Sequence, residues 1–279
     1  MRIEQVFWIA DYLRYLWNSH SRHGTHSPFV YSFADQVLYR KDEPECLDFI
    51  ELERSRLLQF KTSSFENSMQ TNSVPTSIET PVKGVNRLKN RNFYKSIPPR
   101  KYLSFLFRFL NWDLATFSNF LELGSSMGAI PAIIQEVDPT VTGWIIDSLY
   151  DELSSPGVAN DSFLEISPNF KKTSLLVPLD ASYLKEIIGN IGPTQKLDFI
   201  AINDCWDTLM DENSAYWLMD IISDYGVIMI NRLDEFWKQR DLWDRLIRHP
   251  RATASIDLFK MGIIFVRKEQ LKETFILRY

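Results

Sequence analysis

The chain has few cysteines, no long apolar run and no excess of positive charge, and each absence excludes a class of protein. Its 279 residues include only two cysteines, Cys46 and Cys205, and their separation matches no zinc or redox motif. No apolar stretch approaches the roughly 20 residues that span a bilayer, and the early acid Glu4 is not typical of a signal peptide. The net charge of -5 argues against general nucleic-acid binding. We therefore expect a cytoplasmic protein in reducing surroundings, without disulfides, zinc or a membrane anchor.

The composition is sufficient for one large core with an appendage, since 45% of the residues are hydrophobic and 14% are aromatic. Apolar residues recur at helical spacing in three stretches of the first 60 residues, the last of them Leu47–Phe60. Residues 62–81 are rich in Ser, Thr and Asn, and we expect them to be mobile. The sequence therefore predicts an N-terminal helical region (1–61), a polar and then basic linker or flap (62–100), and an α/β domain (101–279).

Seven lysines and arginines lie within residues 83–101 without an acid between them. Because Phe93 and Tyr94 are interleaved with these cations, the segment could bind RNA or phosphate. It could also be a solvated segment that packs on an acidic body, or a flap over the mouth of a site. We favour the solvated segment and expect no appreciable RNA binding.

From residue 119 onward, strand and helix patterns alternate, which predicts a mostly parallel, doubly wound sheet. The expected strands are Asn119–Leu123, Val141–Ile146, Ser174–Val177, Leu197–Ile202, Gly226–Ile230, Ala252–Phe259 and Met261–Arg267. Only a tight connection separates the last two strands, so we expect them to pair antiparallel. A further apolar run over Thr274–Tyr279 could close one edge of the sheet.

A glycine-rich turn between Gly124 and Gly128 follows the first of these strands and leads into an apolar, helical segment. Glycine permits positive φ and close approach, and such a turn places bare backbone amides and a helix N-terminus where a ligand can bind. Glu122 precedes the turn and can reach a ribose hydroxyl or an amine. Ser126 replaces the middle glycine of the dinucleotide fingerprint, which disfavours a nucleotide-binding oxidoreductase. The turn alone could equally belong to another α/β protein.

Three runs resemble a bacterial family of class I S-adenosylmethionine-dependent methyltransferases: RHGTHSPFVYSF at 22–33, FLELGSSMG at 120–128 and RHPRATASIDLFKMGIIFVRKEQ at 248–270. The resemblance covers nearly the whole chain. It implies a Rossmann-like domain whose seven-stranded sheet ends in an antiparallel hairpin, preceded by a helical N-terminal region. It also implies S-adenosylmethionine as the cofactor and methyl transfer to a small-molecule substrate. The acceptor and the oligomeric state stay open.

The resemblance further implies cofactor-binding roles for residues at the strand ends. The Gly124–Gly128 loop, including Ser126, would lie against the methionine and ribose parts, with Glu122 near the amino or ribose groups. Asp147 would hold the ribose hydroxyls, and Asp180 would accept a hydrogen bond from the adenine amino group. Each of these two aspartates could instead cap the helix that follows it.

The ends of the fourth and fifth strands depart from the family pattern, because Asn203 and Asn231 stand where relatives carry acids. In metal-dependent O-methyltransferases such acids hold Mg²⁺, which prefers hard, charged oxygens. With two asparagines and the nearby Arg232 cation, we expect no metal site. Asn203, Asp204 and Asn231 could still position a methyl acceptor. They could equally be remnants in a non-catalytic protein that binds a ligand or a protein partner, so the sequence leaves open whether the chain is an enzyme.

Overall fold

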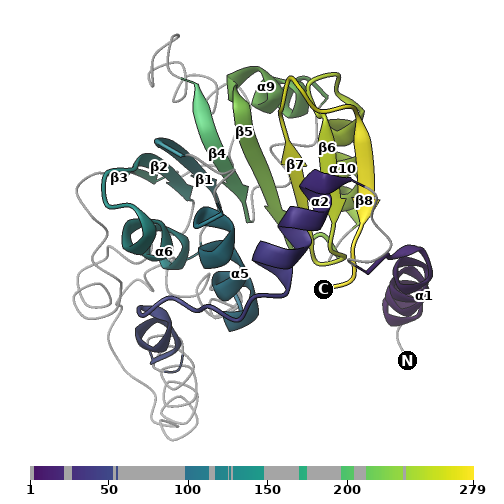
Figure 1. Ribbon diagram of the computed structural model, residues 1–279, viewed down its shortest axis with the longest axis horizontal. Coiled ribbons are helices and arrows are strands. Elements are labelled where there is room, and N and C mark those ends of the chain that lie inside the picture. The colour runs from purple at the N-terminus through teal and green to yellow at the C-terminus, as the bar shows by residue number, and fades with distance from the viewer. Residues whose placement is uncertain are drawn as a thin grey trace, which may run out of the picture.

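The computed structural model describes residues 3–21, 27–52, 55, 98–112, 117–124, 126, 128–147, 170–174, 196–203, 212–234 and 237–279. Eight strands in this part of the chain form one sheet in the order β3-β2-β1-β4-β5-β7-β6-β8 (Figure 1). The strands are β1 (Asn119–Leu123), β2 (Thr142–Asp147), β3 (Phe170–Ser174), β4 (Leu197–Ile202), β5 (Ile222–Asn231), β6 (Ala254–Asp257), β7 (Met261–Phe265) and β8 (Glu273–Ile276).

The strand directions confirm the predicted fold class. Strands β1 to β5 pair in parallel, and β7 is antiparallel to both β5 and β6. This is the mostly parallel, Rossmann-like sheet with an antiparallel hairpin that is typical of class I methyltransferases. Strand β8 adds an eighth strand that pairs in parallel with β6, at the place where the apolar run after residue 273 could close an edge.

The third strand lies earlier in the chain than the sequence predicts. Pairing with β2 places β3 at Phe170–Ser174, whereas the apolar pattern favours Ser174–Val177. Strand β3 is at the end of the sheet, and edge strands often carry lysines that discourage further pairing. Because β3 contains two lysines, it has no continuous apolar run, and the apolar pattern does not predict it.

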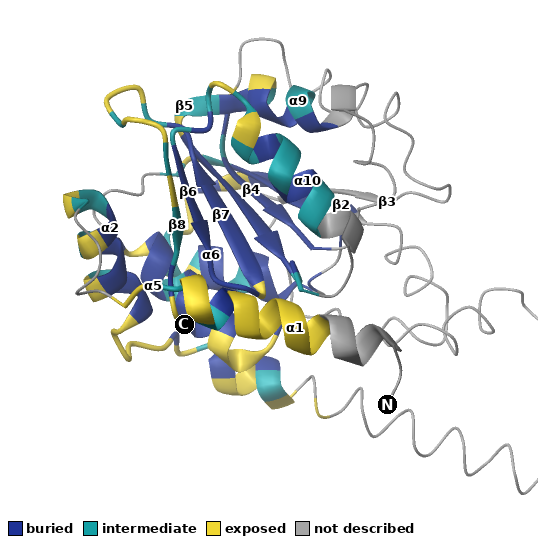
Figure 2. Cartoon of the chain, turned by 90° about the vertical axis from the view of Figure 1, so that its right-hand side faces the viewer, coloured by how far each residue is buried: buried dark blue, intermediate teal, exposed yellow. Residues whose placement is uncertain are grey.

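Helices cover both faces of the sheet (Figure 1). They are α1 (Ile3–Asn18), α2 (Pro28–Phe33), the π-helix η2 (Ala34–Leu38), α5 (Arg100–Leu110), α6 (Ala129–Val137), α9 (Glu212–Ile221) and α10 (Trp237–Arg248). Successive strand residues point to opposite faces, so Phe120 packs with α2, η2, α5 and α6, while Leu121 packs with α9 and α10. Figure 2 shows the central strands buried and much of α1 exposed. None of the described helices is long and apolar enough to cross a bilayer.

The described N-terminal residues share one core with the sheet. Phe33 is fully buried, and its ring lies 6.1 Å from those of Phe105 on α5 and Phe265 on β7. The predicted third helix begins at Leu47 and is described through residue 52. Residues 62–81 and most of the basic run lie outside the described residues, so the predicted boundaries at 61 and 100 stay predictions.

Two cations of the basic run, Arg100 and Lys101, belong to the first turn of α5. Arg100 donates hydrogen bonds to Glu43 at 2.6 Å and to Asp48 at 2.9 Å. The Lys101 ammonium lies 3.8 Å from the centroid of the Tyr279 ring. Both cations therefore contact other parts of the protein, and the interpretation of the basic run as a whole stays a prediction. The other five lie outside the described residues.

Candidate functional site

The candidate site lies at the carboxyl ends of β1 and β4. Strand β1 pairs with β2 on one side and with β4 on the other, so the chain reverses its progress through the sheet at this point. Ligands of open α/β sheets bind in the crevice at such a switch point. Two parts of the chain meet here. One is Glu122 of β1 with the loop that follows it, and the other is Asn203, directly after β4.

Glu122 anchors the glycine loop. Its side chain is fully buried, and Oε1 accepts hydrogen bonds from the Ser126 backbone N–H at 2.8 Å and from Asn203 Nδ2 at 2.9 Å. A buried carboxylate requires such donors, because its loss of hydration is otherwise very costly. The carboxylate therefore ties the loop after β1 to the end of β4.

The two glycines of the loop have the conformation that the turn was expected to require. Gly124 and Gly128 have φ values of 82° and 83°, in the left-handed region that side chains disfavour. The Gly124 N–H donates to the Ile146 carbonyl of β2 at 2.9 Å. The loop thus turns sharply at both ends and is held against the neighbouring strand.

At the first two residues of α6, the amides are not bare. Ser126 satisfies the first two, since its carbonyl accepts from the Ala129 N–H at 3.2 Å and its Oγ accepts from the Ile130 N–H at 3.1 Å. The third helical residue is Pro131, which has no N–H. Anion binding at a helix N-terminus needs free donors, so this helix start is poorly suited to a pyrophosphate.

Asn203 presents a buried acceptor at the same place. Its side chain is 3% exposed, Nδ2 donates to Glu122, and the backbone N–H donates to the Leu123 carbonyl at 2.7 Å. Oδ1 is buried and has no hydrogen-bond partner among the described residues. A buried acceptor without a donor costs free energy. The Oδ1 atom therefore marks a position where a ligand donor would be stabilising.

Tyr102 on α5 is a polar group that sequence reasoning did not assign to the site. Its hydroxyl donates to Met229 Sδ of β5 at 3.3 Å. Burial, and to a lesser degree the charge of Glu122, raise the pKa of the Tyr102 hydroxyl, so it remains protonated at neutral pH. The only signal in the sequence was its position on the apolar side of an amphipathic helix.

Asn231 ends β5, on the strand that pairs with β4. Its side chain is 7% exposed, and Oδ1 accepts from the backbone N–H of Arg232 at 3.0 Å. Arg232 has a φ of 59°, which is uncommon for a residue with a side chain. The Asn231 side chain thus supports a strained turn, and its role toward a substrate stays a prediction.

The remaining predicted residues are only partly described. Asp147 ends β2, where it pairs with Ser174, but its side chain is not among those described. Asp180 and Asp204 lie outside the described residues, so their roles stay predictions. Within the described part of the chain, no three potential metal ligands come together.

No protein-family model and no curated protein sequence matches the chain. Among solved structures, it is similar to an O-methyltransferase from Bacillus cereus in complex with SAH (14% identity, 85% of this chain and 97% of that chain, TM-score 0.43). It is also similar to an SAH-bound methyltransferase from Podospora anserina (13% identity, 75% and 94%, TM-score 0.43). A third similar structure is an O-methyltransferase from Streptomyces achromogenes with SAM (11% identity, 73% and 96%, TM-score 0.40). At these identities and TM-scores the similarities assign no function to this chain, and its fold class rests on strand order and direction.

Proposed function

We propose that the chain binds S-adenosylmethionine at the carboxyl ends of β1, β2 and β4 and transfers its methyl group to a small-molecule acceptor. The observation that carries the proposal is the glycine loop at the switch point of this sheet, held in place by the buried Glu122. The cofactor supplies an electrophilic methyl group on a sulfonium. The protein's main task is then to bind and align the two reactants.

The chemistry of the loop fits this cofactor better than a dinucleotide. S-adenosylmethionine carries a sulfonium and an ammonium and has no phosphate. The start of α6 offers no free amide at Ala129 or Ile130, whereas Glu122 and Asn203 Oδ1 supply negative charge and a buried acceptor. We assign the Gly124–Gly128 loop to the methionine and ribose parts, Asp147 to the ribose hydroxyls and Asp180 to the adenine.

On the acceptor side, we assign Asn203, Asp204 and Asn231 to positioning the substrate. An amide side chain cannot take a proton from the acceptor, so a general base must be a carboxylate, an imidazole or water. Of these three residues only Asp204 is a carboxylate, and we therefore assign proton removal to it. No metal ion is needed in this scheme.

A non-catalytic ligand-binding protein is the second candidate, and the contacts of the two asparagines favour it. Asn203 Nδ2 is used to hold Glu122, and Asn231 Oδ1 is used to hold a turn. Both side chains therefore have structural partners that do not require a substrate. Such a protein would bind the cofactor but show no turnover with any acceptor.

Calorimetry and thermal unfolding with S-adenosylhomocysteine test the cofactor assignment. At a free ligand concentration of about 100 times Kd, binding should raise the free energy of unfolding of the wild-type protein by about 2.7 kcal/mol. Gly124→Val should bind more weakly, because a branched side chain is strained at this φ and occupies space that the ligand needs. NAD serves as a control that should not bind, because Ser126 already accepts from the Ala129 and Ile130 amides at the start of α6, which are then not free for its pyrophosphate. Absence of a thermal shift with saturating S-adenosylhomocysteine would refute the assignment.

A further inference from the structure

A row of polar side chains crosses the carboxyl ends of β1, β4 and β5. Strands β4 and β5 pair in parallel with Ile202 beside Ile230, so the next residues, Asn203 and Asn231, lie roughly 5 Å apart at the ends of neighbouring strands. Ile202 and Ile230 pack on the face that α9 and α10 cover. Because successive strand residues alternate between faces, the two asparagines lie on the opposite face, under α5. Glu122 shares this face and bonds to Asn203.

The hydrogen bonds of the two asparagines determine which amide group remains for a ligand. Asn203 Nδ2 donates to Glu122 at 2.9 Å, so Oδ1 is the remaining end of that amide. Oδ1 is buried and has no hydrogen-bond partner among the described residues. Asn231 Oδ1 is already used, since it accepts from the Arg232 N–H at 3.0 Å. Asn203 Oδ1 is therefore the acceptor of this row that a bound molecule can satisfy with an N–H or O–H.

An amide oxygen accepts a hydrogen bond but does not take a proton away. A hydroxyl has a single proton, and once this proton is donated to Asn203 Oδ1, it is not available to a base. The hydroxyl oxygen then cannot become the oxyanion that attacks a methyl group readily. A neutral amine can donate one N–H to Oδ1 and keep its lone pair for the attack. The geometry at Asn203 therefore suits a nitrogen nucleophile better than an oxygen nucleophile.

The buried carboxylate beside Asn203 acts in the same direction. Glu122 is fully buried, and burial, followed by the charge of Glu122, raises the pKa of the Tyr102 hydroxyl. An oxyanion next to Asn203 would be disfavoured by the same carboxylate, whereas a positive charge that develops on nitrogen would be stabilised. Arg232, which follows Asn231, is the charged group that acts in the opposite sense, so its removal is part of the test.

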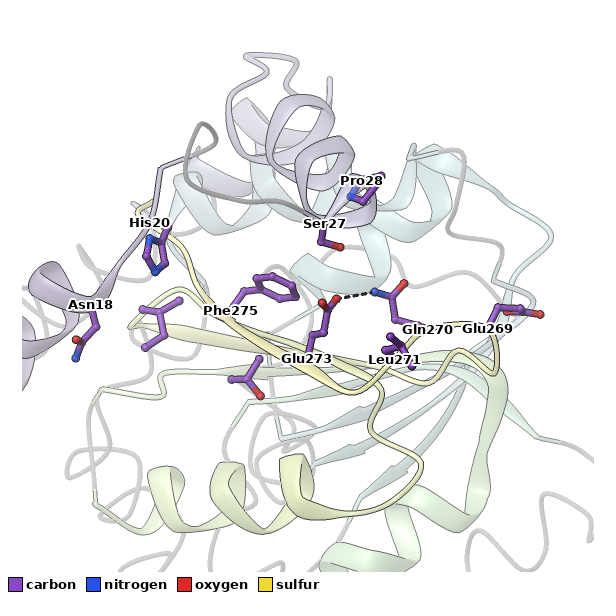
Figure 3. A pocket seen from close by; sticks show the side chains of 11 residues that line it. Asn18, His20, Ser27, Pro28, Glu269, Gln270, Leu271, Glu273 and Phe275 are labelled. Atoms are coloured by element: carbon purple, nitrogen blue, oxygen red, sulfur yellow. Dashed lines mark hydrogen bonds between the residues drawn. The ribbon is translucent and has the colours of Figure 1, made fainter.

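The cavity along β8 is too far from this row to hold the methyl acceptor. It has a volume of about 650 Å³, and its lining includes His20 and Phe275 but no residue of β1, β4 or β5 (Figure 3). In the sheet, β8 is three positions beyond β5, which corresponds to roughly 14 Å. Reacting atoms must approach to about 3–3.5 Å. A cofactor at β1 and β4 therefore requires an acceptor at the ends of β4 and β5.

We propose that the methyl acceptor is a neutral amine whose N–H donates to Asn203 Oδ1. This inference rests on the proposed methyl transfer and names the chemical class of its substrate. The nitrogen lone pair forms the new bond to the methyl carbon while the bond from that carbon to sulfur breaks. The electrons of the broken bond remain on sulfur, which gives S-adenosylhomocysteine. The methylated ammonium then releases a proton to Asp204 or to water.

Sinefungin tests the hydrogen bond to Asn203, because it has a carbon with an ammonium group where S-adenosylmethionine has a sulfonium with a methyl group. S-adenosylmethionine is the matched ligand, with a positive charge but no N–H at that position. We expect calorimetry to show that the wild-type protein binds sinefungin at least about tenfold more tightly than S-adenosylmethionine. Asn203→Ala should abolish this preference. Arg232→Gln should change both affinities together and retain the preference.

Equal affinity of the wild-type protein for the two compounds would overturn the proposal while the cofactor assignment still holds. If neither compound binds, the cofactor assignment itself is wrong. Transfer of a tritiated methyl group to aniline, 2-aminopyridine and 1-naphthylamine, compared with phenol, 2-hydroxypyridine and 1-naphthol, tests the nucleophile. We expect label in the amines, and faster labelling of the hydroxyl compounds would overturn the proposal. Where label enters neither set, the preference for sinefungin decides.

Discussion

Glu122 and Asn203 form a buried pair in which one carboxylate oxygen accepts two hydrogen bonds. Asn203→Asp would replace the amide donor by a second carboxylate, and two adjacent buried carboxyls retain a proton because both cannot ionise without large cost. The pKa of the pair in the folded state is then raised above its unfolded value. Stability contributed by that proton is present at low pH and is lost as the pH rises through the folded-state pKa.

We therefore predict that Asn203→Asp destabilises the protein by roughly 1–3 kcal/mol at pH 8 and by clearly less at pH 5. Urea denaturation at the two pH values measures the difference. Asn203→Ala is the matched control, because it removes the same donor without adding a charge, and its destabilisation should vary little over this range. An equal loss at both pH values for the aspartate variant would contradict the described geometry.

Asp147 is the residue assigned to the ribose hydroxyls, at the end of β2. Asp147→Ala should weaken S-adenosylhomocysteine binding by roughly 1.5–3 kcal/mol, the usual loss for a charged hydrogen-bond partner. Asp11→Ala, at an exposed acid on α1, is the control and should leave the affinity unchanged. Calorimetry measures both. Unchanged affinity in Asp147→Ala would make this acid a helix cap or a surface residue.

At the residue scale, the sequence was sufficient where the site is local and insufficient where it is not. Glu122, Gly124 and Gly128 lie around one turn, and the motif located them together. The hydrogen bond between Glu122 and Asn203 joins residues 81 positions apart and depends on the pairing of β1 with β4. Tyr102 lies on a helix that precedes the sheet, and its hydroxyl contacts Met229 of β5, 127 positions away. Neither hydrogen bond has a local pattern that could have predicted it.

Helix α10 packs on β7 through a contact that only glycine permits. A Cβ atom added at Gly262 would lie 2.5 Å from ring atoms of Trp243, and that ring is 2% exposed within the core. Because the indole is large and surrounded, it cannot retreat freely. Overpacking of this kind lowers the free energy of unfolding by roughly 1–3 kcal/mol.

Gly262→Ala should therefore lower the free energy of unfolding by roughly 1–3 kcal/mol, as measured by urea denaturation. Trp243→Leu provides the control through a double-mutant cycle, because the alanine should cost much less once the indole is gone. If the free-energy costs of the two changes are strictly additive, the close approach of α10 and β7 is not the reason why an alanine at position 262 is destabilising.

At the element scale, central strands were predicted better than edges. The bounds of β1 and β4 agree with the apolar pattern, because both strands are buried on both faces and read as continuous apolar runs. The position of β3 was predicted wrongly, because a partly polar edge strand lacks a continuous apolar run. The π-helical turn at Ala34–Leu38 was not anticipated either, since its sequence has the same apolar spacing as an ordinary helix.

At the scale of the whole molecule, the sequence divided the chain into regions but could not show how they pack. The apolar helical pattern of the first 60 residues did predict helices there. The structure adds that residues of α2 and η2 enter the same core as α5, α6 and the sheet. Packing across such sequence distances depends on shape complementarity in three dimensions, which a periodic pattern does not record.

The two ends of the chain are joined by contacts of α1 with the residues after β8. The Tyr15 hydroxyl donates to the Leu277 carbonyl, and Arg278 donates to the Leu16 carbonyl at 2.9 Å near the end of α1. Tyr15 is 7% exposed, and burial raises its pKa to about 12. Because this value is above that of an unfolded tyrosine, the stabilisation is present below about pH 10 and is lost as the pH rises toward 12.

Tyr15→Phe should therefore lower the free energy of unfolding at pH 7 by about 0.5–1.5 kcal/mol, the net value of one hydrogen bond. The difference between the wild type and the variant should shrink as the pH rises above 10. The Tyr15 hydroxyl of the wild type ionises more readily in the unfolded state than in the folded state, and this ionisation stabilises the unfolded state. Denaturation curves at pH 7, 10 and 11 measure this. Tyr31→Phe, at an exposed tyrosine on α2, is the control and should show neither effect. A difference that stays constant over this range would mean that the Tyr15 hydroxyl does not hold α1 to the end of the chain, and that its aromatic contacts with Phe259 carry the attachment instead.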